Sequence, residues 1–248
     1  MFMFTARSVI SLVLLAGCAS TSGAQPHDMS VVHHEAEASS HEAEAGRHAA
    51  QYDAAARAAR ERCMTATAGT APTDACWTSV TNPTTDHLRE AERHRRMAAD
   101  HRAASQALRD AETRACAGLR DDDRDTSPFA HREDIAGVAP LTEPATSGRV
   151  TSQRSVGAVV TFRAVPGMTA EWLQRLIDCH GARAAALGHE VPEMPYCPLA
   201  LREVQARVTS TGNGFAVAIR ADDPATVEEI LRRARGLTSQ PAAAGTSP

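Results

Sequence analysis

The sequence predicts an α+β protein in which an alanine-rich antiparallel helical hairpin precedes a small β-α-β-β-α domain. Two observations lead to this prediction. In the first half of the chain, histidine, alanine and glutamate recur every seven residues, which is typical of helices packed along a seam. In the second half, short strand-like runs and segments with an apolar helical stripe follow one another, which is typical of a mixed domain.

The helical hairpin is expected to span residues 29 to 119, with helices from 29 to 66 and from 86 to 118. Alanine and glutamate, both strong helix formers, fill most positions of the repeat. Gly69 and Pro72 indicate the bend between the helices. The seven-residue spacing predicts a left-handed seam. The repeat carries seven of the eleven histidines, namely His27, His34, His41, His48, His87, His94 and His101.

These histidines are candidate metal ligands. Glutamate precedes three of them by four residues, which places both side chains on one helix face. Imidazole and carboxylate suit zinc, copper or nickel. Seven residues of helix rise about 10.5 Å, so successive histidines of one helix cannot share an ion across bonds of about 2 Å. With a bend near residue 75, the best cross-helix pair is His48 with His101. The predicted ligand set is His34, His41, His48, His87, His94, His101, Glu37, Glu44 and Glu90.

Two other interpretations of the histidines stay open at this point. They can decorate a solvated helix face, with glutamates as ordinary ion-pair partners. They can also sense pH, because an unperturbed imidazole changes charge near pH 6.5.

Five cysteines besides Cys18 permit two disulfides and leave one thiol. Pairing neighbours in sequence predicts Cys63–Cys76 and Cys179–Cys197 bridges, with Cys116 as the odd thiol. A competing interpretation is that one short segment supplies soft ligands for copper(I). This interpretation excludes the Cys179–Cys197 bridge, because an oxidised pair cannot bind metal as thiolates. That cluster comprises Cys179, His180, His189, Met194 and Cys197.

Residues 120 to 155 are predicted to be a linker with a short helix over 127 to 135, because Pro140, Pro144 and Gly148 favour a loop. The mixed domain is expected from 156 to 237. Its pattern predicts a strand, a helix capped by Thr169, two strands joined by a turn at 211 to 214, and a last helix. Residues 238 to 248 are expected to be a disordered tail.

The order β-α-β-β-α matches a ferredoxin-like sandwich that lacks its final strand. Gly167-Met168-Thr169, between the first strand and the first helix, resembles the start of the heavy-metal-associated domain motif. That family would place its ligand cysteines where this chain has Ala170 and Leu173. The resemblance therefore supports the fold and argues against metal transfer at this loop.

The first eighteen residues are typical of an export signal. Arg7 precedes an apolar run from 9 to 16 that is too short to span about 30 Å of hydrocarbon. The segment Leu15-Ala16-Gly17-Cys18 resembles the lipobox of bacterial lipoproteins. The resemblance implies a signal peptide over 1–17, acylation of Cys18, and a lipidated tether over 18–28. Ala19, in place of the aspartate that retains such proteins in the inner membrane, favours an outer-membrane anchor facing the periplasm.

Composition and the absence of certain motifs argue against some classes of function. The net charge is −4 and the arginines form no dense basic patch, which argues against nucleic-acid binding. The sequence contains no nucleophile elbow, phosphate loop or zinc-protease motif, so no enzymatic activity is predicted. The resulting hypothesis is a lipid-anchored periplasmic protein that binds zinc or copper through its heptad histidines. The alternative is a structural or adaptor lipoprotein whose hairpin docks onto an envelope protein.

Overall fold

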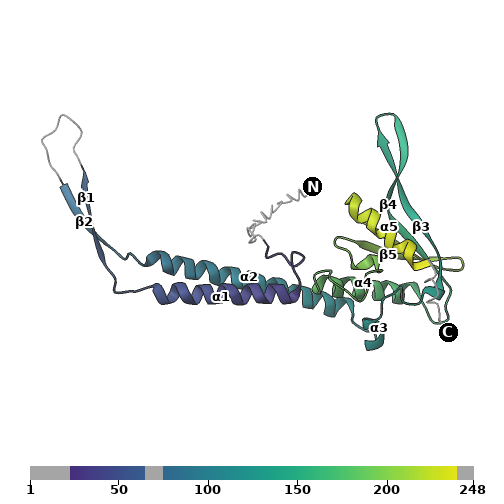
Figure 1. Cartoon of the computed structure of the whole chain (residues 1–248), viewed down its shortest axis with the longest axis horizontal. Coiled ribbons are helices and arrows are strands. Elements are labelled where there is room, and N and C mark those ends of the chain that lie inside the picture. The colour runs from purple at the N-terminus through teal and green to yellow at the C-terminus, as the bar shows by residue number, and fades with distance from the viewer. Residues whose placement is uncertain (1–22, 65–74, 239–248) are drawn as a thin grey trace, which may run out of the picture.

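A long helical hairpin and a compact α/β unit meet end to end (Figure 1). The computed structural model describes the backbone of residues 23–64 and 75–238, and the side chains of these ranges except residues 58–80. Its helical region followed by a four-stranded antiparallel sheet with helices confirms the α+β class. The lipobox with Cys18 and the tail from residue 239 lie outside the described residues. No described helix is long and apolar enough to cross a membrane.

Helices α1 (Val31–Gln51) and α2 (Thr85–Ala115) run antiparallel and side by side (Figure 1). Ser30 begins α1, because its hydroxyl accepts a hydrogen bond from the backbone N–H of His33 at 3.2 Å. The second helix agrees closely with the prediction. The first ends at Gln51 rather than at residue 66, and the predicted continuation forms strand β1 (Ala58–Met64), which pairs with β2 (Ala75–Thr81). Cross-strand pairing thus overrides the helix propensity of this alanine-rich segment.

A small group of polar side chains closes the helical hairpin where α1 ends. The Thr84 hydroxyl accepts from the backbone N–H of Asp53 at 3.0 Å. The Asn82 side-chain amide donates to the Asp53 carbonyl at 2.8 Å. These bonds satisfy backbone groups that the next helical turn would otherwise use, so the chain leaves α1 here.

The α/β unit is built on strands β3 (Ile135–Ser147), β4 (Val150–Arg163), β5 (Gln205–Thr211) and β6 (Gly214–Arg220). They form one antiparallel sheet in the order β3-β4-β6-β5. Helix α4 (Ala170–Ala186) packs along β5, and helix α5 (Pro224–Thr238) packs along β3 and β4. The predicted β-α-β-β-α order is present as β4-α4-β5-β6-α5, with Thr169 capping α4 as expected.

The predicted linker at 120–155 is wrong over most of its length, because β3 and the start of β4 occupy it. Its short helix is α3 (Asp121–Asp125) rather than a helix over 127–135. Pro140 and Pro144 suggested a loop, but both lie in β3. Because β3 is an edge strand, a missing N–H on its outer side breaks no ladder bond.

One disulfide joins the two parts of the molecule. Cys116, at the end of α2, is bonded to Cys179 in α4. This corrects the predicted Cys179–Cys197 bridge, and Cys197 is the free thiol among the described cysteine side chains. Cys63 and Cys76 stand opposite each other in the β1–β2 register, and their bridge stays a prediction because their side chains lie outside the described set.

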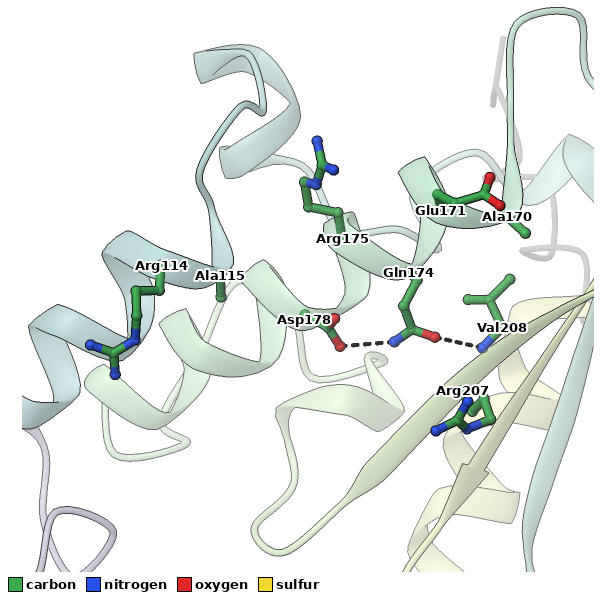
Figure 2. Close-up of a pocket in the computed structure, with 9 residues that line it drawn as sticks. All are labelled: Arg114, Ala115, Ala170, Glu171, Gln174, Arg175, Asp178, Arg207 and Val208. Carbon is green, nitrogen blue, oxygen red and sulfur yellow. Dashed lines mark hydrogen bonds between the residues drawn. The ribbon is translucent and has the colours of Figure 1, made fainter.

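The outer edge of β5 is covered by one side chain of α4. The Gln174 amide oxygen accepts from the N–H of Val208 at 2.7 Å (Figure 2). The amide nitrogen of Gln174 donates to the Ala206 carbonyl at 3.2 Å. Replacing Gln174 by alanine should lower the free energy of unfolding by about 1–2 kcal/mol, because two bonds to strand backbone are lost. Urea denaturation measures the change. The matched control is Glu171→Ala in the exposed first turn of α4, which should shift stability by less than about 0.5 kcal/mol.

Candidate metal centre

Six of the seven heptad histidines lie in the seam between α1 and α2, whereas His27 precedes α1 and is exposed. Along each helix they alternate with small residues at spacings of four and three, as seam positions do in a coiled coil. His34 is fully buried, His101 is 3 % exposed, and the other four are half-buried. An arrangement on a solvated face is therefore wrong for these residues. The buried alanines between them are Ala38, Ala45, Ala91 and Ala98.

Each of the three seam histidines of α1 faces one histidine of α2. The Nδ1–Nδ1 distances are 3.1 Å for His34 with His101, 3.1 Å for His41 with His94, and 3.3 Å for His48 with His87. The predicted pairing of His48 with His101 is wrong. It assumed a bend near residue 75, whereas α1 ends at Gln51 and the helices are joined through β1 and β2.

The six rings form one continuous row along the hairpin. Ring centroids of the facing pairs are 5.3 to 5.6 Å apart. His101 also stacks on His41 at 5.6 Å, and His94 on His48 at 5.7 Å, which links each pair to the next. Every imidazole of the row therefore has close neighbours on the opposite helix.

Each Nδ1–Nδ1 contact needs one protonated nitrogen and one lone pair. For His34 the tautomer follows from its other nitrogen, because Nε2 lies 3.4 Å from the Pro26 carbonyl oxygen, to which only an N–H can donate. The His34 Nδ1 then carries the lone pair and accepts from His101. A metal ion can take the place of the proton between the two Nδ1 atoms. Two ligands of a tetrahedral zinc lie about 3.3 Å apart, which is close to the distance between these atoms.

The pKa values of the buried rings favour the neutral form that binds metals. Burial lowers the pKa of His101, with a further lowering from the nearby His34 and His41. Burial also lowers the pKa of His94, assisted by the charge of Arg93. Both imidazoles are therefore held neutral at physiological pH.

Carboxylates approach the seam at one level of the hairpin. Ligand atoms of His48, Glu90 and His94 all lie within 4.8 Å of one another. Glu44 interacts electrostatically with the same two histidines. Glu37 is exposed and belongs to no group of three or more metal-ligand residues among the described side chains. A second group, His131, Glu133 and Asp134, is mostly exposed and lies in the α/β unit.

Arginines hold the two carboxylates of this level. Arg47 donates to Glu44 at 3.1 Å, and Arg93 donates to Glu90 at 2.8 Å. These hydrogen bonds lower the pKa of each carboxyl. Both glutamates are therefore ionised and fixed beside the seam.

The soft-ligand cluster predicted in the α/β unit is not assembled as a metal site. Cys179 is in the disulfide, and the buried Cys197 sulfur lies 3.1 Å from Nε2 of His180. Burial raises the pKa of the Cys197 thiol and lowers that of His180 to about 4. His189 uses Nδ1 to donate to the Ala200 carbonyl. The pair of His180 and Cys197 is thus a neutral, buried contact of the core.

A groove of ≈ 500 Å³ between the end of α2, α4 and β5 is lined by three arginines (Figure 2). Arg114, Arg175 and Arg207 leave three different elements and point away from one another in this view. Glu171 and Asp178 line the same groove and offset their charge. The groove therefore does not focus positive charge on one point.

Comparison with family models, with curated proteins and with solved structures finds no significant match. The candidate site consequently rests on the geometry of the seam. Once the extent of α1 is known, only one antiparallel register sets His34, His41 and His48 opposite the three histidines of α2.

Proposed function

We propose that this chain is a lipid-anchored envelope protein whose helical hairpin binds divalent transition-metal ions in its histidine seam. The observation that carries the proposal is the row of six imidazoles in facing pairs along the seam, one level of which also presents carboxylates. Imidazole and carboxylate ligands suit zinc and copper(II), whereas thiolate and thioether sulfur select copper(I). The anchor is inferred from the lipobox resemblance at Cys18, and the periplasmic, outer-membrane location from the same segment.

We also propose that the α/β unit is a ferredoxin-like sandwich in which β3 takes the place of the final strand. The order β3-β4-β6-β5 and the β4-α4-β5-β6-α5 sequence support this assignment. The unit would then serve as a rigid base for the hairpin, to which the Cys116–Cys179 bridge fastens it.

The test is a calorimetric titration of the purified protein with zinc and with copper(II) at neutral pH. Dissociation constants in the micromolar range or below are expected, corresponding to about −8 kcal/mol or more favourable. Replacing all three α2 seam histidines (His87, His94 and His101) by asparagine should weaken binding by at least about 100-fold, because half of the imidazoles are removed. The matched control is His33→Asn, at an exposed histidine of α1 outside the seam, and it should change nothing.

Circular dichroism of the variants checks that the helices persist. Imidazole NMR signals of the unmodified protein supply a readout that needs no substitution, since the signals of the seam histidines should shift on zinc addition while that of His33 stays unchanged. Binding weaker than about 1 mM, or binding that the seam substitutions leave intact, would overturn the proposal.

A further inference from the structure

A five-residue segment occurs once in each helix of the hairpin. Residues 44–48 read Glu-Ala-Gly-Arg-His and residues 90–94 read Glu-Ala-Glu-Arg-His. In both segments the alanine is buried in the seam, the arginine binds the glutamate, and the histidine belongs to the row of rings. The two helices are antiparallel, so the segments face each other with approximate two-fold symmetry.

From this repetition we infer that the hairpin holds a single divalent cation between these segments, with His48, His94, Glu44 and Glu90 as its four protein ligands. The inference rests on the proposed function and specifies where in the seam the ion binds. The chemical class of the ion is a borderline divalent metal that accepts two imidazoles and two carboxylates, such as Zn²⁺ or Co²⁺.

The ligands are already close together. His48, Glu90 and His94 have ligand atoms within 4.8 Å of one another, and their rings are stacked with centroids 5.7 Å apart. Glu44 and Glu90 each interact electrostatically with both histidines. All four side chains are half-buried. Glu44 is not part of the group within 4.8 Å, so binding as inferred requires its side chain to turn toward the ion.

The neighbouring histidines are suited to orient the ligands. Nδ1 of His94 lies 3.1 Å from Nδ1 of His41, and Nδ1 of His48 lies 3.3 Å from Nδ1 of His87. A ligating imidazole ordinarily uses its second nitrogen in a hydrogen bond that fixes the ring. His41 and His87 are therefore positioning residues on either side of the ion.

Charge distinguishes this level from the others. Two carboxylates neutralise a divalent ion, whereas a set of imidazoles alone leaves two positive charges in a poorly solvated seam. Seven residues further along, between His41 and His101, Glu37 stands at the position of Glu44 and Met97 at that of Glu90, so this level has one carboxylate instead of two. At the end next to the α/β unit, His34 is tied to the Pro26 carbonyl, and among the described side chains no carboxylate joins this pair as a third ligand.

The test combines zinc calorimetry with cobalt spectroscopy on the full protein. We expect one ion per chain and intense visible absorption from four-coordinate Co²⁺. The double variant Glu44→Gln/Glu90→Gln should lose at least about 100-fold in affinity, because even residues that only support ligands contribute 10–100-fold. The matched control is Glu92→Gln, an exposed glutamate two residues from Glu90.

A second variant tests the seam at a different level. His34→Asn/His101→Asn removes two buried rings but none of the inferred ligands, so it should lose much less affinity than the Glu44→Gln/Glu90→Gln variant. Zinc binding that survives the glutamate substitutions, or that is lost in this second variant, overturns the inference and leaves the proposed function standing. No zinc binding to the unmodified protein overturns both.

Discussion

Loss of the Cys116–Cys179 disulfide is expected to lower the free energy of unfolding by about 4 kcal/mol. The bridge closes a loop with a sequence separation of 63, and a cross-link of that span restricts the unfolded chain strongly. It also fastens the last turn of α2 to α4, so its removal should loosen the junction between the hairpin and the α/β unit.

The measurement is urea denaturation of Cys116→Ala/Cys179→Ala. Substitution is preferred to a reducing agent, because a reductant would also break the predicted Cys63–Cys76 bridge. Cys197→Ala is the matched control, since it removes a buried sulfur without breaking a bridge. The difference between the two variants isolates the cross-link. Equal destabilisation by both would show that the bridge contributes nothing.

Acidification from pH 7 to pH 4 is expected to cost about 3 kcal/mol of stability through His180 alone. The pKa of this histidine is lowered from 6.5 to about 4, chiefly by burial and secondarily by the charge of Arg183. Above pH 6.5 both the folded and the unfolded chain hold the imidazole neutral. Between pH 6.5 and 4 the unfolded chain binds a proton that the folded chain excludes, so stability falls as the pH falls.

The side chains around His180 do not compensate for a charge on its ring. The Cys197 thiol at Nε2 stays protonated because its own pKa is raised, and Arg183 repels an imidazolium. An NMR titration should therefore find the His180 ring neutral down to about pH 4. His180→Gln should remove this component of the pH dependence, and His131→Gln, at an exposed site, should keep it. A ring that titrates near pH 6.5 would contradict the burial.

The parts of the fold that the sequence predicted correctly depend on local patterns. Helix α2 follows an uninterrupted heptad of helix formers, and the β5–β6 hairpin follows the Gly212-Asn213-Gly214 turn. Helix α4 begins at Thr169 because that hydroxyl accepts from the N–H of Trp172. Each of these signals lies within a few residues of the structure it specifies.

The errors concern interactions between distant segments. The residues after Gln51 have high helix propensity, and only their pairing with β2 makes them a strand. Pro140 and Pro144 exclude a central strand but not the edge position that β3 takes. The partner of Cys179 depends on how α2 packs against α4, which neighbouring cysteines in the sequence do not reveal.

The candidate site shows the same division. The choice of histidine and glutamate as ligands came from composition and i,i+4 spacing. The histidine that faces each of these ligands could not be predicted in the same way, because it depends on where α1 ends. The observed register shows that residues 44–48 of α1 and 90–94 of α2 lie close together across the seam. Glu44 and Glu90 therefore differ from the exposed glutamates nearby.

Between His34 and His48, and across the facing part of α2, the buried apolar residues of the seam are alanines, so imidazole rings take the place that leucine or isoleucine fills in an ordinary helical hairpin. Aliphatic packing is indifferent to acidity, but a row of six rings gains charge and mutual repulsion as protons are added. The packing of this hairpin, which is about 30 Å long along α1, therefore depends on the pH of the surrounding solution as well as on its own residues.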